Sequence, residues 1–376
     1  MKKVLFVATL VKNHLMEFHQ PYLKLFHDLG WETSVVSRND YENPDQCVIP
    51  NCDHFYDAPF ERSPLKKGNL TACRITRRVI RDGNFDIIHC HTPMGAVAAR
   101  LGALGARKRG TKVIYTAHGF HFYKGAPLRN WLLYFPVEWL LAPVTDVLIT
   151  INREDYARAK KCLRAKSIVY IPGVGIDTEK FRGNEARGAA LRRELGIPEN
   201  ATVLLSVGDL NTNKNHALVL EALARLRDPN LYYVVCGRGE LQQAHEDYVR
   251  THGLEGRVFF MGYRNDVKDF YAMADAFVFP SFREGLSVSV MEAMASGLPV
   301  LASRIRGNTD ILEEGVNGFL FDPADTADLV RALERLPRGE RRLEMGRANR
   351  ERAEHYSIHT IVDAYREIYR SQGLGD

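Results

Sequence analysis

The chain has 376 residues, of which 45% are hydrophobic and 26% charged. This composition is typical of a folded globular protein and excludes a disordered or fibrous chain, and the length predicts two domains with a cleft between them. The net charge of +5 is unevenly spread, because residues 1–180 carry 26 Lys and Arg against 17 Asp and Glu, whereas residues 181–376 carry 25 against 29. The amino-terminal half is therefore the basic one.

The first residues, MKKVLFVATLVKNH, begin like a signal peptide, with two lysines before an apolar run. Lys12 interrupts that run and no small-residue cleavage site follows, which favours a buried first strand. Elsewhere no apolar stretch approaches the roughly 20 residues that span a bilayer. The sequence predicts a cytoplasmic protein, at most peripheral at the inner face of the cytoplasmic membrane.

Short β-branched and apolar runs then alternate with helical patterns. The predicted strands are VLFVATLV, ETSVVS, FDIIHCH, TKVIYTAH, DVLITIN and SIVYIPG, followed after a polar stretch by ATVLLSVG, LYYVVCG, RVFFMG, AFVFPS and PVLAS. This alternation predicts an α/β fold with two successive Rossmann-like units. We place the domains at 1–178 and 179–355, and expect the amphipathic helix in 356–376 to pack back toward the first domain.

Two features of the basic half leave alternatives open. Its cations cluster at Arg62, Lys66, Lys67, Arg74, Arg77, Arg78 and Arg81, and again at Arg107, Lys108, Arg109 and Lys112. A solvated helix face explains such clusters, and so does attraction to anionic lipid or to a diphosphate-bearing acceptor. The aromatic and leucine-rich segment 122–146 is expected to pack in the core, with contact to a membrane interface as the alternative.

Candidate ligand contacts follow the predicted strands, where open parallel sheets bind their ligands. In SFREGLSVSVMEAMASG, a strand ends at Ser281 and a helix is predicted from about Ser287 to Ser296. The amides of Gly285, Leu286 and Ser287 would then lie at a helix N-terminus, which favours a phosphate. Glu284 in the loop and Glu292 in the helix could accept hydroxyls from the two ends of one ligand, or could be ordinary solvated acids.

Other loops offer a cation and histidines. Lys214 and Asn215 follow the turn at Gly208, where Lys214 could neutralise a diphosphate, although no complete phosphate-binding loop surrounds it. The G-x-G of CGRGEL misses its third glycine and is weak evidence for a dinucleotide. His118 and His121 follow a strand and could contact a sugar hydroxyl or be structural.

No metal or disulfide site is predicted. The six cysteines form no C-x-x-C pair, and the histidines, including His89 and His91 two apart in a strand, lack metal-ligand spacing. The chain also contains no D-x-D sequence, which metal-dependent transferases of another fold use to hold their cation. We expect no cofactor, no metal and no nucleic-acid partner.

In combination these motifs resemble the retaining glycosyltransferases of family 4. The resemblance rests on E284-x7-E292, IPGVGIDTEKF, DLNTNKN, FDIIHCHTP and TAHGF, and extends from about residue 3 to 370. YTAHGFHFYKG and ITINREDY are similar to segments of the capsular and exopolysaccharide branch. The resemblance implies the GT-B architecture of two Rossmann-like domains facing across a cleft.

It also implies transfer of a hexose or N-acetylhexosamine from a UDP-sugar, with retention, to a saccharide acceptor carried on polyprenyl diphosphate. The catalytic residues implied are His118, Glu284 and Lys214. The donor-binding residues expected beside them are Gly208, Asn215, Arg238, Tyr263, Arg264, Arg283, Gly285, Leu286, Ser287 and Glu292. Acceptor contacts are expected from His14, Leu15, His91 and His121.

One departure from the family pattern is Asp209, which follows Gly208 where many relatives have an arginine. A second cation must then come from elsewhere, with Arg238, Arg264 and Arg283 as candidates. In the working mechanism the acidic second domain binds the donor and the basic first domain binds the acceptor, near an anionic membrane. A nucleotide-sugar epimerase, a non-catalytic nucleotide-sugar-binding partner and, less well, an NAD-dependent dehydrogenase are the alternatives.

Overall fold

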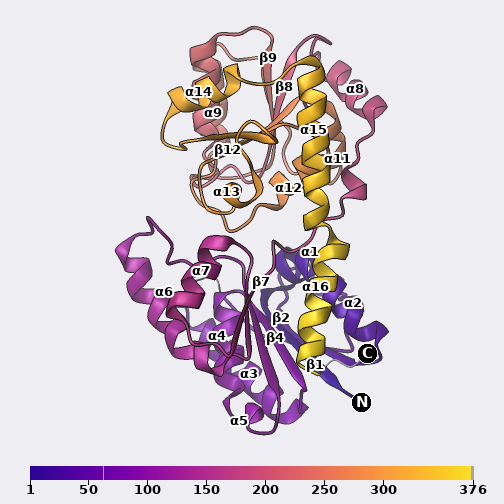
Figure 1. The fold of residues 1–376 in the computed structure, drawn as a ribbon, viewed down its shortest axis with the longest axis vertical. Helices are drawn as coiled ribbons and strands as arrows, with labels where there is room; N and C mark the ends of the chain where they lie inside the picture. The colour runs from indigo at the N-terminus through magenta and orange to yellow at the C-terminus, as the bar shows by residue number, and fades with distance from the viewer. Residues whose placement is uncertain (62, 374–376) are drawn as a thin grey trace. The chain divides into compact units, whose positions relative to one another are not determined.

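A computed structural model describes residues 1–61 and 63–373 (Figure 1). The chain forms two compact units, the first made of residues 1–175 together with the segment from Ile361, and the second of Ile176–Thr360. The passage from first to second unit thus lies three residues before the boundary expected from the sequence. Arg62, named in the first basic cluster, is outside the described residues.

The first unit is built on a seven-stranded parallel sheet in the order β3-β2-β1-β4-β5-β6-β7. Its strands are β1 (Lys3–Leu10), β2 (Glu32–Arg38), β3 (His54–Asp57), β4 (Ile87–His91), β5 (Lys112–Ala117), β6 (Val147–Thr150) and β7 (Ser167–Tyr170). The order reverses direction between β1 and β4, and open α/β sheets bind ligands beyond the carboxyl ends of the strands at such a switch point.

Helices cover both faces of this sheet (Figure 1). They are α1 (Met16–Phe18), α2 (Gln20–Asp28), α3 (Gly68–Gly83), α4 (Pro93–Gly102), α5 (Leu104–Arg107), α6 (Leu128–Leu141), α7 (Arg153–Cys162) and α16 (Ile358–Ser371). Successive residues of β1 enter different cores, because strand side chains alternate between faces. Val4 and Phe6 pack with α2 and α16, whereas Leu5 and Val7 pack with α3, α4 and α7.

The last helix, α16, completes the first unit. It buries Ile361, Tyr365 and Tyr369 in the same cluster as β1 and α2. The Tyr369 hydroxyl lies 2.7 Å from Nδ1 of His89 in β4, and the Tyr365 ring contacts that of Tyr22 at a centroid distance of 4.4 Å. A segment that follows the whole second unit in the sequence, 280 residues after His89 in the case of Tyr369, therefore supplies part of this core.

The second unit repeats the topology with a six-stranded parallel sheet in the order β10-β9-β8-β11-β12-β13. Its strands are β8 (Thr202–Val207), β9 (Leu231–Cys236), β10 (Val258–Phe260), β11 (Ala276–Phe279), β12 (Val300–Ser303) and β13 (Gly318–Phe321). Here the switch point falls between β8 and β11. Each unit therefore has the strand order of a Rossmann domain, as the alternation in the sequence predicts.

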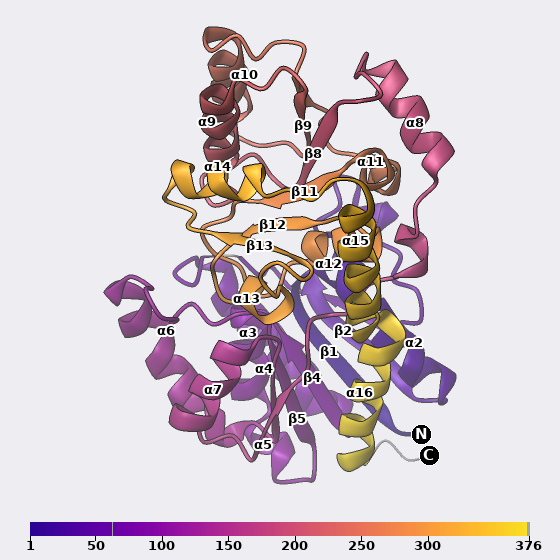
Figure 2. The ribbon, with the colours of Figure 1, turned by 45° about the horizontal axis from the view of Figure 1, so that its top comes forward.

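Two helix layers cover the second sheet, α9, α10 and α14 on one face and α8, α11, α12 and α15 on the other (Figure 2). The helices are α8 (Glu185–Glu194), α9 (His216–Leu226), α10 (Gln242–Thr251), α11 (Val267–Met273), α12 (Val288–Ala295), α13 (Asn308–Ile311), α14 (Thr326–Glu334) and α15 (Gly339–Ala353). Short turns of other helical types are η1 (Val11–Leu15, a π-helical turn), η2 (Pro44–Gln46), η3 (Ala142–Val144), η4 (Glu179–Phe181) and η5 (Glu354–Tyr356).

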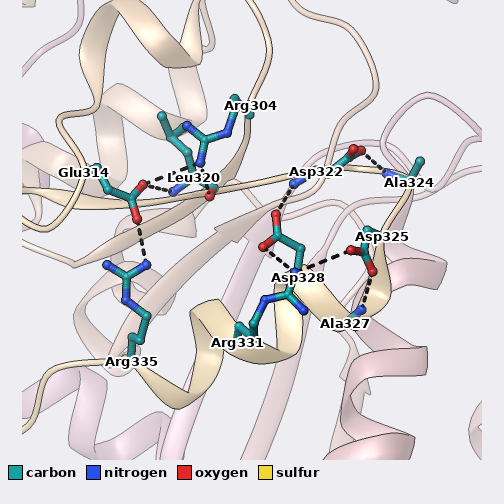
Figure 3. Close-up of polar contacts among 10 residues, drawn as sticks. All are labelled: Arg304, Glu314, Leu320, Asp322, Ala324, Asp325, Ala327, Asp328, Arg331 and Arg335. Atoms are coloured by element: carbon teal, nitrogen blue, oxygen red, sulfur yellow. Dashed lines mark hydrogen bonds and ion pairs between the residues drawn. The ribbon is translucent and has the colours of Figure 1, made fainter.

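A carboxylate network orders the loop after the edge strand β13 (Figure 3). Asp325 caps α14 by accepting the Ala327 amide at 2.8 Å, and Asp328 accepts the Asp322 amide at 2.8 Å. Glu314, which precedes β13, accepts the amide of Leu320 on the strand at 2.9 Å and pairs with Arg335 at 2.8 Å. These bonds fix a loop whose Pro323 carbonyl contacts the candidate site described next.

Candidate functional site

The second unit brings two of the predicted catalytic residues into direct contact. Lys214 lies in the loop after β8 and Glu284 in the loop after β11, so both stand at the carboxyl ends of the strands that flank the switch point. The Lys214 Nζ donates to Glu284 Oε1 at 2.8 Å, and its ammonium lies 4.8 Å from the centroid of the Phe279 ring. A cation and a carboxylate are thus paired where an α/β sheet binds its ligand.

Backbone contacts hold these two loops together. The Phe282 amide donates to the Asn213 carbonyl at 2.8 Å, and the Asn213 side-chain amide returns a bond to the Arg283 carbonyl at 3.0 Å. Asn215, in the left-handed conformation at φ 55, donates its side-chain amide to the carbonyls of Pro280 and Pro323. The side chains of these two asparagines link neighbouring loops by hydrogen bonds. Asn215 therefore has a structural role in addition to the donor-binding role predicted for it.

A third loop, after β12, supports Glu284 from another side. Arg306 Nε donates to the Glu284 carbonyl at 3.2 Å. The neighbouring Gly307 has φ 82, and a Cβ there would lie 2.1 Å from the Gly285 carbonyl oxygen. Only glycine permits so close an approach. The loop that carries Glu284 is therefore held by contacts with the loop after β8 and with the loop after β12.

Helix α12 begins at Val288, one residue after the predicted start, and carries Glu292 on its second turn. Glu292 Oε2 accepts a hydrogen bond from the Tyr271 hydroxyl at 2.9 Å, and that hydroxyl also donates to the Ser289 carbonyl at 3.1 Å. Tyr271 is fully buried in α11, and burial followed by the neighbouring carboxylate raises its pKa well above the usual value. The phenol therefore stays protonated and orients Glu292.

The N-terminus of α12 fits the predicted anion site in its chemistry. The Ser287 side chain pairs with the Ser289 hydroxyl at 3.1 Å and forms no capping bond to the helix. The first amides of a helix have no partner within it and carry the positive end of its dipole. The loop Gly285–Ser287 leads directly into these amides, beside the Lys214–Glu284 pair.

The remaining predicted donor residues occupy the same end of the sheet. A Cβ on Gly208 would lie 3.3 Å from Lys214 Cε, and one on Gly237 would lie 1.9 Å from the Gly208 carbonyl oxygen. These glycines let the loops after β8 and β9 pack backbone to backbone. Of the candidates for a second cation at the diphosphate, Arg264 already donates to Asp266 at 2.8 Å, which makes it a weaker candidate for that role.

The other two predicted arginines and one tyrosine are accessible. Arg238 is exposed and packs over Gly262, Arg283 is exposed, and Tyr263 is 67% exposed. Arg306 is a further candidate cation that the sequence reasoning missed, because RIRGN carries no spacing that ties it to Glu284. Asp209, at the departure from the family pattern, is exposed.

The first unit gathers five histidines near its own switch point. His14 lies in the turn η1 after β1, His89 and His91 in β4, His118 just after β5, and His19 between α1 and α2. His14 Nδ1 and His19 Nε2 are 3.1 Å apart, His118 Nε2 and His91 Nδ1 are 3.4 Å apart, and the His19 and His91 rings stack at 3.7 Å. We refer to these five residues as the histidine cluster.

The predicted acceptor residues differ in their exposure. His91 is fully buried, and Leu15 is buried with its carbonyl already accepting the His19 amide at 2.9 Å. Both side chains are enclosed within the unit, and acceptor contact by His91 and Leu15 stays a prediction. His14 and His118 are partly exposed, and His121 stacks on Tyr134 at a centroid distance of 4.3 Å.

Comparison with known proteins identifies the family of this chain. Residues 189–352 match the family model for Glycosyl transferases group 1, and residues 23–180 match that for Glycosyltransferase Family 4. EpsD of Bacillus subtilis strain 168, a glycosyltransferase by provisional name, is 40% identical over 98% of this chain and 96% of its own length. The chain belongs to the group 1 glycosyltransferases.

Two further similarities extend this result. An Escherichia coli protein named UDP-Gal:alpha-D-GlcNAc-diphosphoundecaprenol alpha-1,3-galactosyltransferase is 31% identical over 69% of this chain and 68% of its own length. Anabaena Alr3699/HepE, whose crystal structure holds UDP and glucose, superposes with a TM-score of 0.79 over 99% of this chain and 100% of that one, at 19% identity. The glycosyltransferase therefore has the GT-B fold.

Burial keeps the histidine cluster of the glycosyltransferase uncharged. It lowers the pKa of His14 to about 4 and those of His89 and His118 to about 3. Burial, together with repulsion from histidine neighbours, also holds the pKa values of His19 and His91 well below the ordinary value. Neutral imidazoles both donate and accept, so the partly exposed His14 and His118 suit contact with hydroxyl groups.

His14, His19 and His118 also place one ring nitrogen each within 4.8 Å of one another. Within residues 1–61 and 63–373 this is the one group of three or more histidine, cysteine or acidic side chains spaced for a metal ion. Because the sequence places these histidines in separate segments, spacing alone did not reveal it. Metal independence stays a prediction.

A cavity of about 1350 Å³ in the second unit lies elsewhere. It opens at the amino ends of β8, β11 and β12, the opposite edge of the sheet from Lys214 and Glu284. Asp275 in its wall is already paired with Arg192 at 2.7 Å and with Arg342. Because parallel sheets bind ligands at their carboxyl ends, this cavity is not the candidate donor site.

Proposed function

We propose that this glycosyltransferase moves a hexose or N-acetylhexosamine from a UDP-sugar, with retention, to a saccharide on polyprenyl diphosphate in exopolysaccharide assembly. The observation that carries the proposal is the constellation at the switch point of the second unit, where Lys214, Glu284, the start of α12 and Glu292 come together. The bound UDP of the Anabaena structure and the diphosphoundecaprenol acceptor in the name of the E. coli relative support the choice of substrates.

The chemistry follows from where charge develops. When the glycosidic bond to the nucleotide breaks, negative charge builds on the β-phosphate of the leaving UDP. Fixed positive groups lower the barrier because they stabilise that charge without reorganising. Lys214 and the first amides of α12 supply them, so the reaction is proposed to need no metal.

The two glutamates divide the donor between them. Glu292, held by Tyr271, is proposed to accept the ribose hydroxyls, and Glu284, beside Lys214, those of the transferred sugar. His118 is proposed to contact the same sugar near the reacting carbon. Retention without an enzymic nucleophile is proposed to proceed by attack of the acceptor hydroxyl on the face that UDP leaves.

Calorimetric titration without added metal tests the donor proposal. The panel is UDP, UDP-glucose, UDP-galactose, UDP-N-acetylglucosamine and UDP-N-acetylgalactosamine, with GDP-mannose as the control nucleotide. We expect Glu292→Ala to weaken plain UDP, and Glu284→Ala to spare UDP but weaken the UDP-sugar. The exposed Glu255→Ala is the matched control in the same unit. Equal loss of UDP affinity in both site variants would refute the division of roles.

Turnover with a synthetic polyprenyl-diphosphate saccharide tests the reaction itself, with the anomeric configuration of the product read by NMR. A product that retains the donor configuration supports the proposal, and an inverted product overturns retention. Formation of an epimer of the donor sugar without an acceptor would indicate an epimerase of the same fold. Tight donor binding with no turnover would indicate a non-catalytic partner.

A further inference from the structure

Helix α6 of the first unit has an unusual distribution of apolar residues. Its sequence, LRNWLLYFPVEWLL, contains only two charged residues, Arg129 and Glu138. Helices that are apolar on all sides are normally buried in a core or a bilayer. The sequence accordingly predicts core packing for this segment.

One side of α6 does pack in the core. Trp131, Tyr134 and Phe135 contact the cluster formed by α3, α4 and the sheet. Glu138 is buried, accepts a bond from Arg100 at 2.8 Å and lies 3.2 Å from the Tyr115 hydroxyl. The only acid of the helix is therefore withdrawn into the protein, where it anchors α6.

The other side is exposed and still apolar. Six large hydrophobic residues on it range from 37% to 73% exposed: Leu128, Leu132, Leu133, Val137, Trp139 and Leu140. We call these six residues the α6 face. Single exposed leucines are ordinary on protein surfaces, but a contiguous group marks an interaction site. The expectation that this segment packs in the core is thus wrong for half of the helix.

The length of α6 limits what the face can bind. Fourteen residues extend about 21 Å at 1.5 Å per residue, less than the roughly 30 Å of a bilayer core. None of the described helices combines the length and hydropathy of a membrane span. A helix of this kind can lie along an interface, with tryptophan and leucine entering the boundary between headgroups and acyl chains.

The segment of the chain that contains α6 is basic, which favours an anionic surface. Residues 124–166 carry eight Lys and Arg against four Asp and Glu. Of these four acids, Glu138 and Asp155 are buried, Asp146 pairs with Arg107 at 3.1 Å, and Glu154 pairs with Arg158 at 2.7 Å. The exposed cations of this stretch include Lys124, Arg129, Lys160, Lys161, Arg164 and Lys166.

We propose that the α6 face docks the first unit on an anionic lipid bilayer, with leucines and Trp139 in the interface and the nearby cations on the headgroups. A protein partner fits less well, because protein interfaces carry about one hydrogen bond per 100–200 Å² and Arg129 is the only charged residue among the exposed positions of α6. The docking is argued from the helix itself and goes beyond the proposed function, although it would bring the enzyme to a lipid-linked acceptor.

Vesicle co-sedimentation of the full chain tests the proposal. The vesicles are phosphatidylcholine with and without phosphatidylglycerol, and no nucleotide or acceptor is present. The variant is Leu132→Ser/Leu133→Ser/Leu140→Ser, matched by Leu101→Ser/Leu104→Ser/Leu343→Ser, which removes leucines of similar exposure elsewhere. We expect the α6 variant to bind anionic vesicles at least about tenfold more weakly, because each buried side chain adds apolar contact area, and the control triple to bind like wild type.

Further readouts separate the outcomes. Added salt should weaken binding, because the cations contribute through screened attraction. Vesicles should shift the tryptophan emission to the blue, and Trp139→Phe should remove that shift while preserving binding. The idea is overturned if wild type does not bind anionic vesicles at low salt, or if the α6 variant binds them as wild type does.

A second copy of the chain is the competing occupant. Self-association of wild type that the α6 variant abolishes, without vesicle binding, would assign the face to that copy and overturn lipid docking. UDP binding by the α6 variant, measured by calorimetry, reports separately on the donor site. An α6 variant that binds UDP normally but no longer binds vesicles supports docking. If the wild type does not bind UDP at all, the proposed function is refuted, and the result with vesicles is unaffected.

Discussion

Mild acid is expected to destabilise the first unit more than the second, because of the histidine cluster. Burial lowers the pKa values of all five imidazoles below the ordinary 6.5, so the folded unit keeps them neutral where the unfolded chain protonates them. Stability is then fully present above about pH 6.5 and is lost as the pH falls, since the unfolded state binds more protons.

The magnitude follows from linkage. At about pH 5.5, one pH unit below the unfolded pKa, each histidine that stays neutral in the folded state costs about 1 kcal/mol, so the five together cost on the order of 5 kcal/mol. That is comparable with the whole stability of a small domain, about 5–15 kcal/mol. The second unit has two such groups, His216 with its pKa lowered to about 4 and His245 with a lowered pKa, and should lose less.

Urea unfolding at a series of pH values between about 7 and 5.5 measures this loss, over the range where linkage predicts it. The three tryptophans, Trp31, Trp131 and Trp139, all lie in the first unit, so their fluorescence reports on that unit alone. His118→Asn should reduce the pH dependence, and His27→Asn, at an exposed position of the same unit, is its control. A fluorescence midpoint that stays constant as the pH falls would refute the reasoning.

Three further outcomes are expected. Tyr271→Phe removes the hydrogen bond to Glu292 and should weaken UDP binding by about tenfold or more in calorimetry, since a bond to a charged group contributes about 1.5–3 kcal/mol. Unchanged affinity would show that Glu292 needs no such support. Gly237→Ala forces a Cβ to 1.9 Å from the Gly208 carbonyl and should lower the thermal midpoint and UDP affinity, whereas Gly105→Ala, which meets open space, should change neither. Chelation with EDTA should leave UDP binding and turnover unchanged, and activity restored only by added divalent metal would contradict metal independence.

Much of the fold could be predicted because parallel strands buried on both faces produce continuous apolar runs. Eleven of the strands fall on the predicted runs, and the two missed strands are short edge strands. His54–Asp57 is mostly exposed and Gly318–Phe321 begins with glycine, so neither shows the expected pattern. The helix at Val288–Ala295 was predictable because Gly297 and Pro299 end it.

The donor-binding residues could be predicted where they directly follow a strand, but the residues that hydrogen-bond to them and hold them in place could not. Lys214 and Glu284 could be named from motifs, whereas Tyr271 reaches Glu292 from a helix 21 residues earlier, and Arg306 comes from a loop with no spacing signal. Hydrophobic periodicity could not say which side of α6 is exposed, because every side of the helix is apolar.

The placement of α16 has a consequence for biosynthesis. Tyr365 and Tyr369 belong to the core of the first unit, yet the ribosome makes them after the whole second unit. Domains usually complete their folding in the order of synthesis. Here the unit that is translated first cannot complete its core, because His89 and Tyr22 still lack their aromatic neighbours. The unit that is translated second can already complete its folding. A nascent chain halted before Ile361 would then hold a finished second unit attached to an unfinished first one.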